Sequence, residues 1–234
     1  MKRKNIIIAF ILLLSCVVTL PSCSNTKTGF TKLLKSDDRD LMFNEAVAYY
    51  EKGSYVKALQ LFDRIAVLVK GTDKEEPLNY YYAQCYYEQS DYVLANYYFK
   101  RYVSQFPFSR RADECAYLAA ICKYMESSSY SLDPTPTTEA ISELQSYINT
   151  YPQSDKIEMC NVYIDELRNK LEEKDYQIAL MYYKMEEYKA AVVCFNNILK
   201  DYPSTTHREE IMYRIVCAQY EFAKNSVTDK KKDR

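Results

Sequence analysis

The sequence predicts an all-α fold built from repeated helical hairpins. The 234 residues include three glycines and no tryptophan, whereas an all-β fold needs many glycines in its turns. A segment centred on an alanine occurs four times, and self-similarity of this kind is typical of a repeat architecture. Apolar residues in each segment recur at helical spacing.

The four segments share one spacing around the central alanine. An aromatic or aliphatic residue follows the alanine by four positions and another follows by seven, so all three lie on one face of a helix. In the last three segments a proline follows by twelve and ends the helix. The central alanines are Ala58, Ala95, Ala140 and Ala191.

A preceding helix is predicted for three of the segments. An alanine and a tyrosine stand 12 and 9 positions before the central alanine, and the small residue would allow two helices to pack closely. These pairs are Ala46 and Tyr49, Ala83 and Tyr86, and Ala179 and Tyr182. In the third segment the stretch from Ser127 to Thr137 is instead predicted as a loop between the helices.

An aromatic-Pro-x-Ser/Thr motif follows the last three segments, beginning at Phe106, Tyr151 and Tyr202. The proline stops one helix, and the hydroxyl residue can cap the next. Thr206 and Glu209 also have capping-box spacing. A further helix is therefore predicted from this point to about Lys224.

The small–aromatic–Ala–Phe–Pro frame of the second and fourth segments resembles the tetratricopeptide repeat. The alanine spacings of 37, 45 and 51 exceed the usual 34, so longer helices or loops are expected between units. The resemblance implies a superhelix of about four full repeats plus the start of a fifth, with first helices lining a peptide groove. The residues expected to line it are Phe43, Val47, Tyr50, Tyr80, Gln84, Tyr87, Tyr176, Leu180 and Tyr183.

The N-terminus is typical of an export signal, with three basic residues before a continuous apolar run. Leu20 and Ser22 precede Cys23 in a pattern that resembles the bacterial lipobox, which implies acylation of Cys23. Cys16 also fits the pattern, but cleavage there would leave the apolar residues 17–20 on the mature end. We therefore expect a signal peptide at 1–22, an acylated cysteine and flexible tether at 23–36, a repeat domain at 37–226 and a charged tail at 227–234.

Composition argues against several functions. The glycines stand too far apart for a phosphate-binding loop, and the single His207 disfavours histidine-based metal sites and triads. His207 itself is expected to be a solvated residue at a helix start. Without the signal the chain has 28 basic and 32 acidic residues, which gives no general attraction to nucleic acid. No enzymatic activity, cofactor or metal is expected.

Six cysteines remain outside the signal region, and none of them forms a C-x-x-C pair. All six lie in helical apolar patterns, which favours buried free thiols. Disulfides stay open as an alternative, since the chain is exported and the number is even. The cysteines are Cys85, Cys115, Cys122, Cys160, Cys194 and Cys217.

The lipobox, short tether and irregular repeats together resemble the BamD, or ComL, family of outer-membrane lipoproteins. The stretches 188–192 and 201–203 and the Pro-containing stretch 133–140 carry the likeness, which covers about residues 28–224. It implies a scaffold of β-barrel assembly, lipid-anchored on the periplasmic face of the outer membrane. Implied partners are the POTRA domains of a BamA-type barrel protein and unfolded outer-membrane proteins. A different adaptor, such as a pilus or secretin pilotin, is the alternative.

Overall fold

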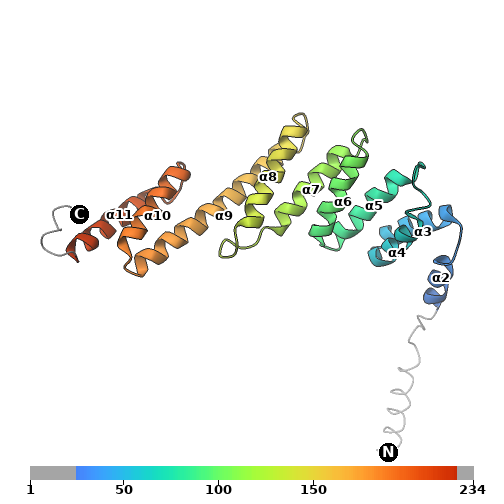
Figure 1. The fold of residues 1–234 in the computed structure, drawn as a ribbon, viewed down its shortest axis with the longest axis horizontal. Helices are drawn as coiled ribbons and strands as arrows, with labels where there is room; N and C mark the ends of the chain where they lie inside the picture. Colours follow the sequence, from blue (N-terminus) through green and yellow to red (C-terminus); the bar gives the residue numbers. More distant parts are fainter. Residues whose placement is uncertain (1–24, 226–234) are drawn as a thin grey trace, which may run out of the picture. The chain divides into compact units, whose positions relative to one another are not determined.

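The computed structural model describes residues 25–225, and within this range all regular secondary structure is helical (Figure 1). The all-α prediction is thereby confirmed. No helix in this range has the length and apolarity needed to cross a membrane. The helices are α2 (Asn25–Leu33), α3 (Arg39–Glu51), α4 (Tyr55–Ile65), α5 (Glu75–Glu88), α6 (Tyr92–Gln105), α7 (Ala112–Glu126), α8 (Thr135–Thr150), α9 (Ile157–Lys184), α10 (Tyr188–Asp201) and α11 (Arg208–Lys224).

The chain divides into two compact units, with the boundary between Leu78 and Asn79. The first unit contains the hairpin of α3 and α4. The Asp38 carboxylate accepts the backbone N–H groups of Asp40 and Leu41, both at 3.0 Å, and so caps α3. The two helices bury a shared apolar core made of Met42, Ala46, Ala58, Leu61, Phe62 and Ile65.

Helix α2 occupies a stretch that was expected to be a flexible tether. Phe30 is 9% exposed and its ring meets Tyr49 edge-on, with 5.4 Å between the centroids. The ammonium group of Lys57 lies over both rings. An aromatic anchor of this kind outweighs the polar composition around it, so residues 25–33 are ordered against the first unit. The signal peptide, Cys16, Cys23 and the tail at 227–234 lie outside the described residues.

The second unit begins within α5 and contains three successive pairs, α5 with α6, α7 with α8 and α9 with α10, followed by α11. Ala95, Ala140 and Ala191 are fully buried, as is Ala58 in the first unit, so the repeat spacing identified the close contacts correctly. Four hairpins and the first helix of a fifth confirm the tetratricopeptide-like prediction.

Helix α9 explains why one repeat spacing is so long. It runs for 28 residues and is visibly extended in Figure 1. Its first half packs Cys160, Ile164 and Leu167 into the core shared with α7 and α8. Its second half packs Tyr176 and Ala179 against α10. One continuous helix therefore contributes to two consecutive cores.

The loop of the third hairpin is shorter than predicted, because α8 already begins at Thr135. The Asp133 carboxylate accepts the Thr135 N–H at 3.1 Å and its hydroxyl at 2.9 Å. Pro136 lies in the first turn, where a proline is tolerated because its missing N–H would have had no helical partner.

The hydroxyl residues of the aromatic-Pro-x-Ser/Thr motif stabilise the turn before each helix. Ser109, Ser154 and Thr205 each accept the backbone N–H two residues later, at 3.1, 3.4 and 3.1 Å. That N–H belongs to the residue before the helix, so the hydroxyls do not cap the helix itself. The capping box predicted at Thr206 is wrong, because α11 begins at Arg208 and has no side-chain cap.

A left-handed residue recurs five positions before the central alanine of three hairpins. Gly53, Ser90 and Glu186 have φ values of 70°, 60° and 63°.

Replacing Gly53 with alanine is expected to lower the free energy of unfolding by about 1 kcal/mol, because a Cβ is disfavoured in this region. Urea unfolding would measure it. As a control, Gly29→Ala within α2 should not destabilise, and equal losses for both would contradict the strain argument.

Candidate functional site

The first helix of each hairpin carries two aromatic residues around a buried alanine, three positions before it and four after it. The spacing places all three on one side of the helix. The sets are Phe43, Ala46 and Tyr50; Tyr80, Ala83 and Tyr87; Tyr117, Ala120 and Tyr124; and Tyr176, Ala179 and Tyr183. The third set does not follow the predicted spacing, because Ala120 precedes its central alanine by 20 positions where the others precede theirs by 12.

Four tyrosines from α5, α7 and α9 gather in the second unit, and we call them the tyrosine surface. They are Tyr87, Tyr117, Tyr124 and Tyr163, all partly buried against one apolar core. The rings of Tyr124 and Tyr163 are 4.4 Å apart. Tyr163 also lies close enough to Tyr117 and to Tyr87 to interact with both electrostatically. The cluster thus offers aromatic ring surface and hydroxyl groups side by side.

The hydroxyls of the tyrosine surface remain protonated well above neutral pH. Burial, followed by the neighbouring Tyr163, raises the pKa of Tyr117 to about 12. The hydrogen bond from Tyr124 to Glu166, 2.5 Å long, and then burial raise the pKa of Tyr124 to about 12. Burial also raises the pKa of Tyr87. These groups therefore stay uncharged, and the Tyr124 oxygen, whose proton goes to Glu166, can still accept a hydrogen bond from a ligand backbone.

Stability should fall as the pH rises from 10 to 12. In this window an unfolded chain releases the Tyr117 and Tyr124 protons, while the folded chain keeps them, so deprotonation favours unfolding. Urea unfolding at pH 9, 10, 11 and 12 measures the loss. A Tyr117→Phe, Tyr124→Phe variant lacks both ionisations and should lose less stability across the window; an identical loss would refute the assignment.

Two residues that were predicted to line the groove are buried. Gln84 is 7% exposed and Tyr176 is 4% exposed. The Tyr176 ring stacks on His207, with 4.2 Å between centroids and 12° between planes. Neither residue offers open surface. His207, expected to be solvated, fills this contact and places Nε2 3.6 Å from the Glu173 carboxylate.

The remaining predicted residues are partly buried in their own units. The Arg111 guanidinium lies 4.5 Å from the centroid of the Tyr80 ring, and the Tyr80 hydroxyl donates to Glu114 at 3.0 Å. The Arg214 guanidinium lies over Tyr183 in the same way. The partly buried residues are Phe43, Val47 and Tyr50 in the first unit, and Tyr80, Tyr87, Leu180 and Tyr183 in the second.

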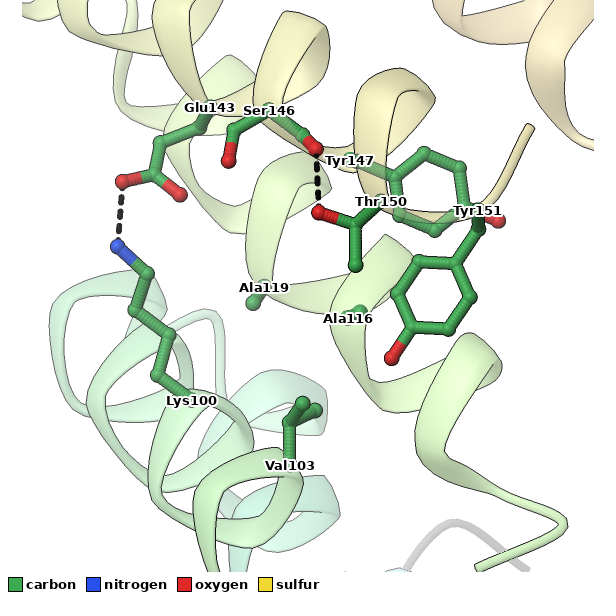
Figure 2. Close-up of a pocket in the computed structure, with 9 residues that line it drawn as sticks. All are labelled: Lys100, Val103, Ala116, Ala119, Glu143, Ser146, Tyr147, Thr150 and Tyr151. Carbon is green, nitrogen blue, oxygen red and sulfur yellow. Dashed lines mark hydrogen bonds and ion pairs between the residues drawn. The ribbon is translucent and has the colours of Figure 1, made fainter. Parts of the chain in front are cut away.

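A small cavity of about 160 Å³ lies between α6, α7 and α8 (Figure 2). Ala116 and Ala119 of α7 line it together with Tyr147 and Tyr151, and Lys100 and Glu143 form an ion pair at its edge. The Tyr147 hydroxyl, held by Asp113 and by Ser154, fixes one wall. Its size suits a single side chain better than an extended peptide.

No cluster of three metal-binding side chains occurs within residues 25–225. None of the six cysteines in this range forms a disulfide in the structure, and Cys194 and Cys217 are the two that are not fully buried. Burial raises the pKa of Cys85 and of Cys122 to about 12, which leaves both as unreactive thiols at neutral pH.

Helical hairpins stacked around small residues, with aromatic side chains along the first helices, define a tetratricopeptide-type repeat protein. This class presents a surface to other polypeptides. The chain belongs to the YfiO family, whose sequence profile is described as outer membrane lipoprotein and matches residues 35–233. The likeness to the BamD family drawn from the sequence is thereby confirmed.

Two relatives carry the name outer membrane protein assembly factor BamD. The protein from Caulobacter vibrioides is 25% identical over 114 residues, which cover 49% of this chain but 37% of that protein. The protein from Rickettsia prowazekii is 23% identical over 188 residues, covering 78% of this chain and 75% of that protein. The match with the first relative thus spans little more than a third of its length.

Proposed function

We propose that this chain is a lipid-anchored scaffold subunit that assembles β-barrel proteins in the outer membrane, and that it has no enzymatic activity. The observation that carries the proposal is the tyrosine surface on α5, α7 and α9, in a chain of a family described as outer membrane lipoproteins. The names of the two BamD relatives agree with this role. The anchor would be acylated Cys23, on the periplasmic face.

Unfolded outer-membrane proteins are the substrates in this proposal. Their strands alternate aromatic and polar residues, and rings on the strand can pack between the rings of the tyrosine surface. The neutral hydroxyls can pair with the exposed backbone of an extended chain. Tyrosine also loses little rotamer freedom on binding, which limits the entropic cost.

Helix α11 supports a second partner, the POTRA domains of a BamA-type barrel protein. Large apolar side chains on this helix follow at spacings of one, three and four residues, which places them along one exposed stripe. An exposed apolar stripe on a soluble domain commonly marks a protein interface. Its members are Met212, Tyr213, Val216 and Tyr220, with exposed fractions between 47% and 70%.

The test uses the full lipoprotein in detergent and the purified POTRA domains of the barrel protein from the same organism. We expect binding, and we expect Val216→Asp with Tyr220→Asp to weaken it at least about tenfold, the loss of one or two interface anchors. Val193→Asp on α10, 54% exposed, serves as the matched control. No binding by the unmodified protein, or loss of pili with normal porins on depletion, would favour the pilotin alternative.

A further inference from the structure

The first unit contains a large cavity with a mixed apolar and basic lining. Residues of α2, α3 and α4 and of their connections line an open cavity of about 810 Å³, a size in the range of small-ligand pockets. Its apolar wall consists of Phe30, Leu33, Leu41 and Tyr49. Leu41 is 45% exposed, which leaves apolar surface open to a ligand.

The rest of the cavity wall is strongly basic. Four lysines line it, against one acidic residue, Glu45. The lysines are Lys32, Lys35, Lys52 and Lys57. Within residues 25–225 none of these four ammonium groups has a carboxylate within 4 Å, so their charge is available to an anion.

Nearby acidic residues have other partners. Asp38 caps α3, and Asp40 pairs with Lys74 and Arg39. These contacts keep two carboxylates committed outside the cavity. An apolar wall beside uncompensated positive charge matches an amphiphile with an acyl chain and an anionic head.

The position of the cavity in the chain identifies the source of such an amphiphile. Helix α2 begins at Asn25, two residues after Cys23. Two extended steps and four helical residues span at most about 14 Å between Cys23 and Gly29, which lines the cavity. An anchor at Cys23 would hold the cavity opening close to the headgroups of the bilayer.

We propose that this cavity binds a phospholipid with an anionic headgroup from the membrane that holds the anchor. The lysines would contact the phosphate, and an acyl chain would lie along Leu33 and Leu41. The inference rests on the proposed function only in taking Cys23 as the anchor. Anchor and cavity would form two attachment points, so the first unit would have a fixed orientation at the membrane.

Photolabelling of the full lipoprotein in vesicles tests the proposal. The vesicles consist of phosphatidylcholine with a small fraction of a diazirine-bearing probe, either phosphatidylglycerol or phosphatidylcholine, and labelled peptides are mapped by mass spectrometry. We expect the anionic probe to label residues 29–57 at least about fivefold more than the zwitterionic probe. Lys35→Glu with Lys57→Glu should reduce this labelling about tenfold, since each lysine near an anionic surface contributes appreciably.

A matched charge reversal separates the cavity from general attraction to the membrane. Arg64→Glu with Lys70→Glu changes two exposed residues of the same unit outside the cavity and should keep the labelling. Equal labelling by both probes, or equal loss in both variants, would overturn the proposal. So would displacement of the label by millimolar inorganic phosphate, which would indicate a site for free phosphate.

Two further measurements distinguish failure of the lipid site from failure of the proposed function. Sedimentation with vesicles reports the anchor, and binding of an unfolded barrel-protein peptide reports the tyrosine surface. If the unmodified protein sediments with vesicles and binds the peptide but shows no selective lipid labelling, lipid binding in the cavity is refuted and the proposed function is not. Normal circular dichroism of each variant confirms that the helices remain folded.

Discussion

Replacing Tyr87 and Tyr124 with alanine is expected to weaken binding of a barrel-protein C-terminal peptide about thirtyfold. Each ring is partly buried against the core shared by α7, α8 and α9, and each contributes contact area to the tyrosine surface. Interface tyrosines commonly contribute about 1–2 kcal/mol each, and about 2 kcal/mol in total corresponds to this factor. Fluorescence anisotropy of a labelled peptide with the full lipoprotein measures it.

Two controls make the result specific. Tyr97 and Tyr220 are exposed on α6 and α11, outside the tyrosine surface, and their replacement with alanine should leave peptide affinity unchanged. Tyr124→Phe removes the hydroxyl that bonds Glu166 but keeps the ring, so it should retain most of the affinity. A double alanine variant that binds as tightly as the unmodified protein would remove these rings from the site. Its helix content must be unchanged for the comparison to count.

The repeat could be predicted from the sequence because its signals are local. A buried alanine with apolar residues four and seven positions later needs only one helix face to be recognised, and Ala58, Ala95, Ala140 and Ala191 all proved to be buried. The prediction of α11 as far as Lys224 succeeded for the same reason. Proline and polar composition set most helix ends within a few residues.

The aromatic residues of the first helices were only partly predictable as a site, because exposure depends on the neighbouring helices. The spacing correctly places Tyr176 beside Ala179, but the spacing alone cannot show that His207 from the following turn covers the ring. Tyr117 and Tyr124 were missed since an insertion separates the helices of their hairpin. A search for two aromatics seven residues apart, with an alanine three residues after the first, would have found them.

The segment at 23–36, predicted to be a flexible tether, shows a different limit of prediction from sequence. Its polar composition predicts flexibility, yet one aromatic residue, Phe30, is enough to fix α2 against Tyr49 and Lys57. A single tertiary contact can decide the state of a nine-residue helix that would be marginal in isolation. Composition and spacing carry no information on a single tertiary contact, so they cannot predict this helix.

Replacing Phe99 with alanine is expected to have the largest effect on stability, a loss of about 3–5 kcal/mol in the free energy of unfolding. Phe99 is fully buried among the small residues Ala83, Ala95 and Cys115, which cannot move to fill the space left by the ring. Its ring also meets Tyr87 edge-on, 6.1 Å between centroids. Urea unfolding followed by circular dichroism at 222 nm measures the change.

Phe108 provides the matched control, because the same substitution at this position removes a ring that is 99% exposed. The free energy of unfolding of the Phe108→Ala variant should stay within about 0.5 kcal/mol of that of the unmodified protein. If Phe99→Ala and Phe108→Ala lose equal stability, the packing around Ala95 cannot be the tight contact inferred from the repeat. A selective loss at Phe99 would instead tie the alanine spacing in the sequence to the energy that holds α5 and α6 together, and through Tyr87 to the peptide-binding surface.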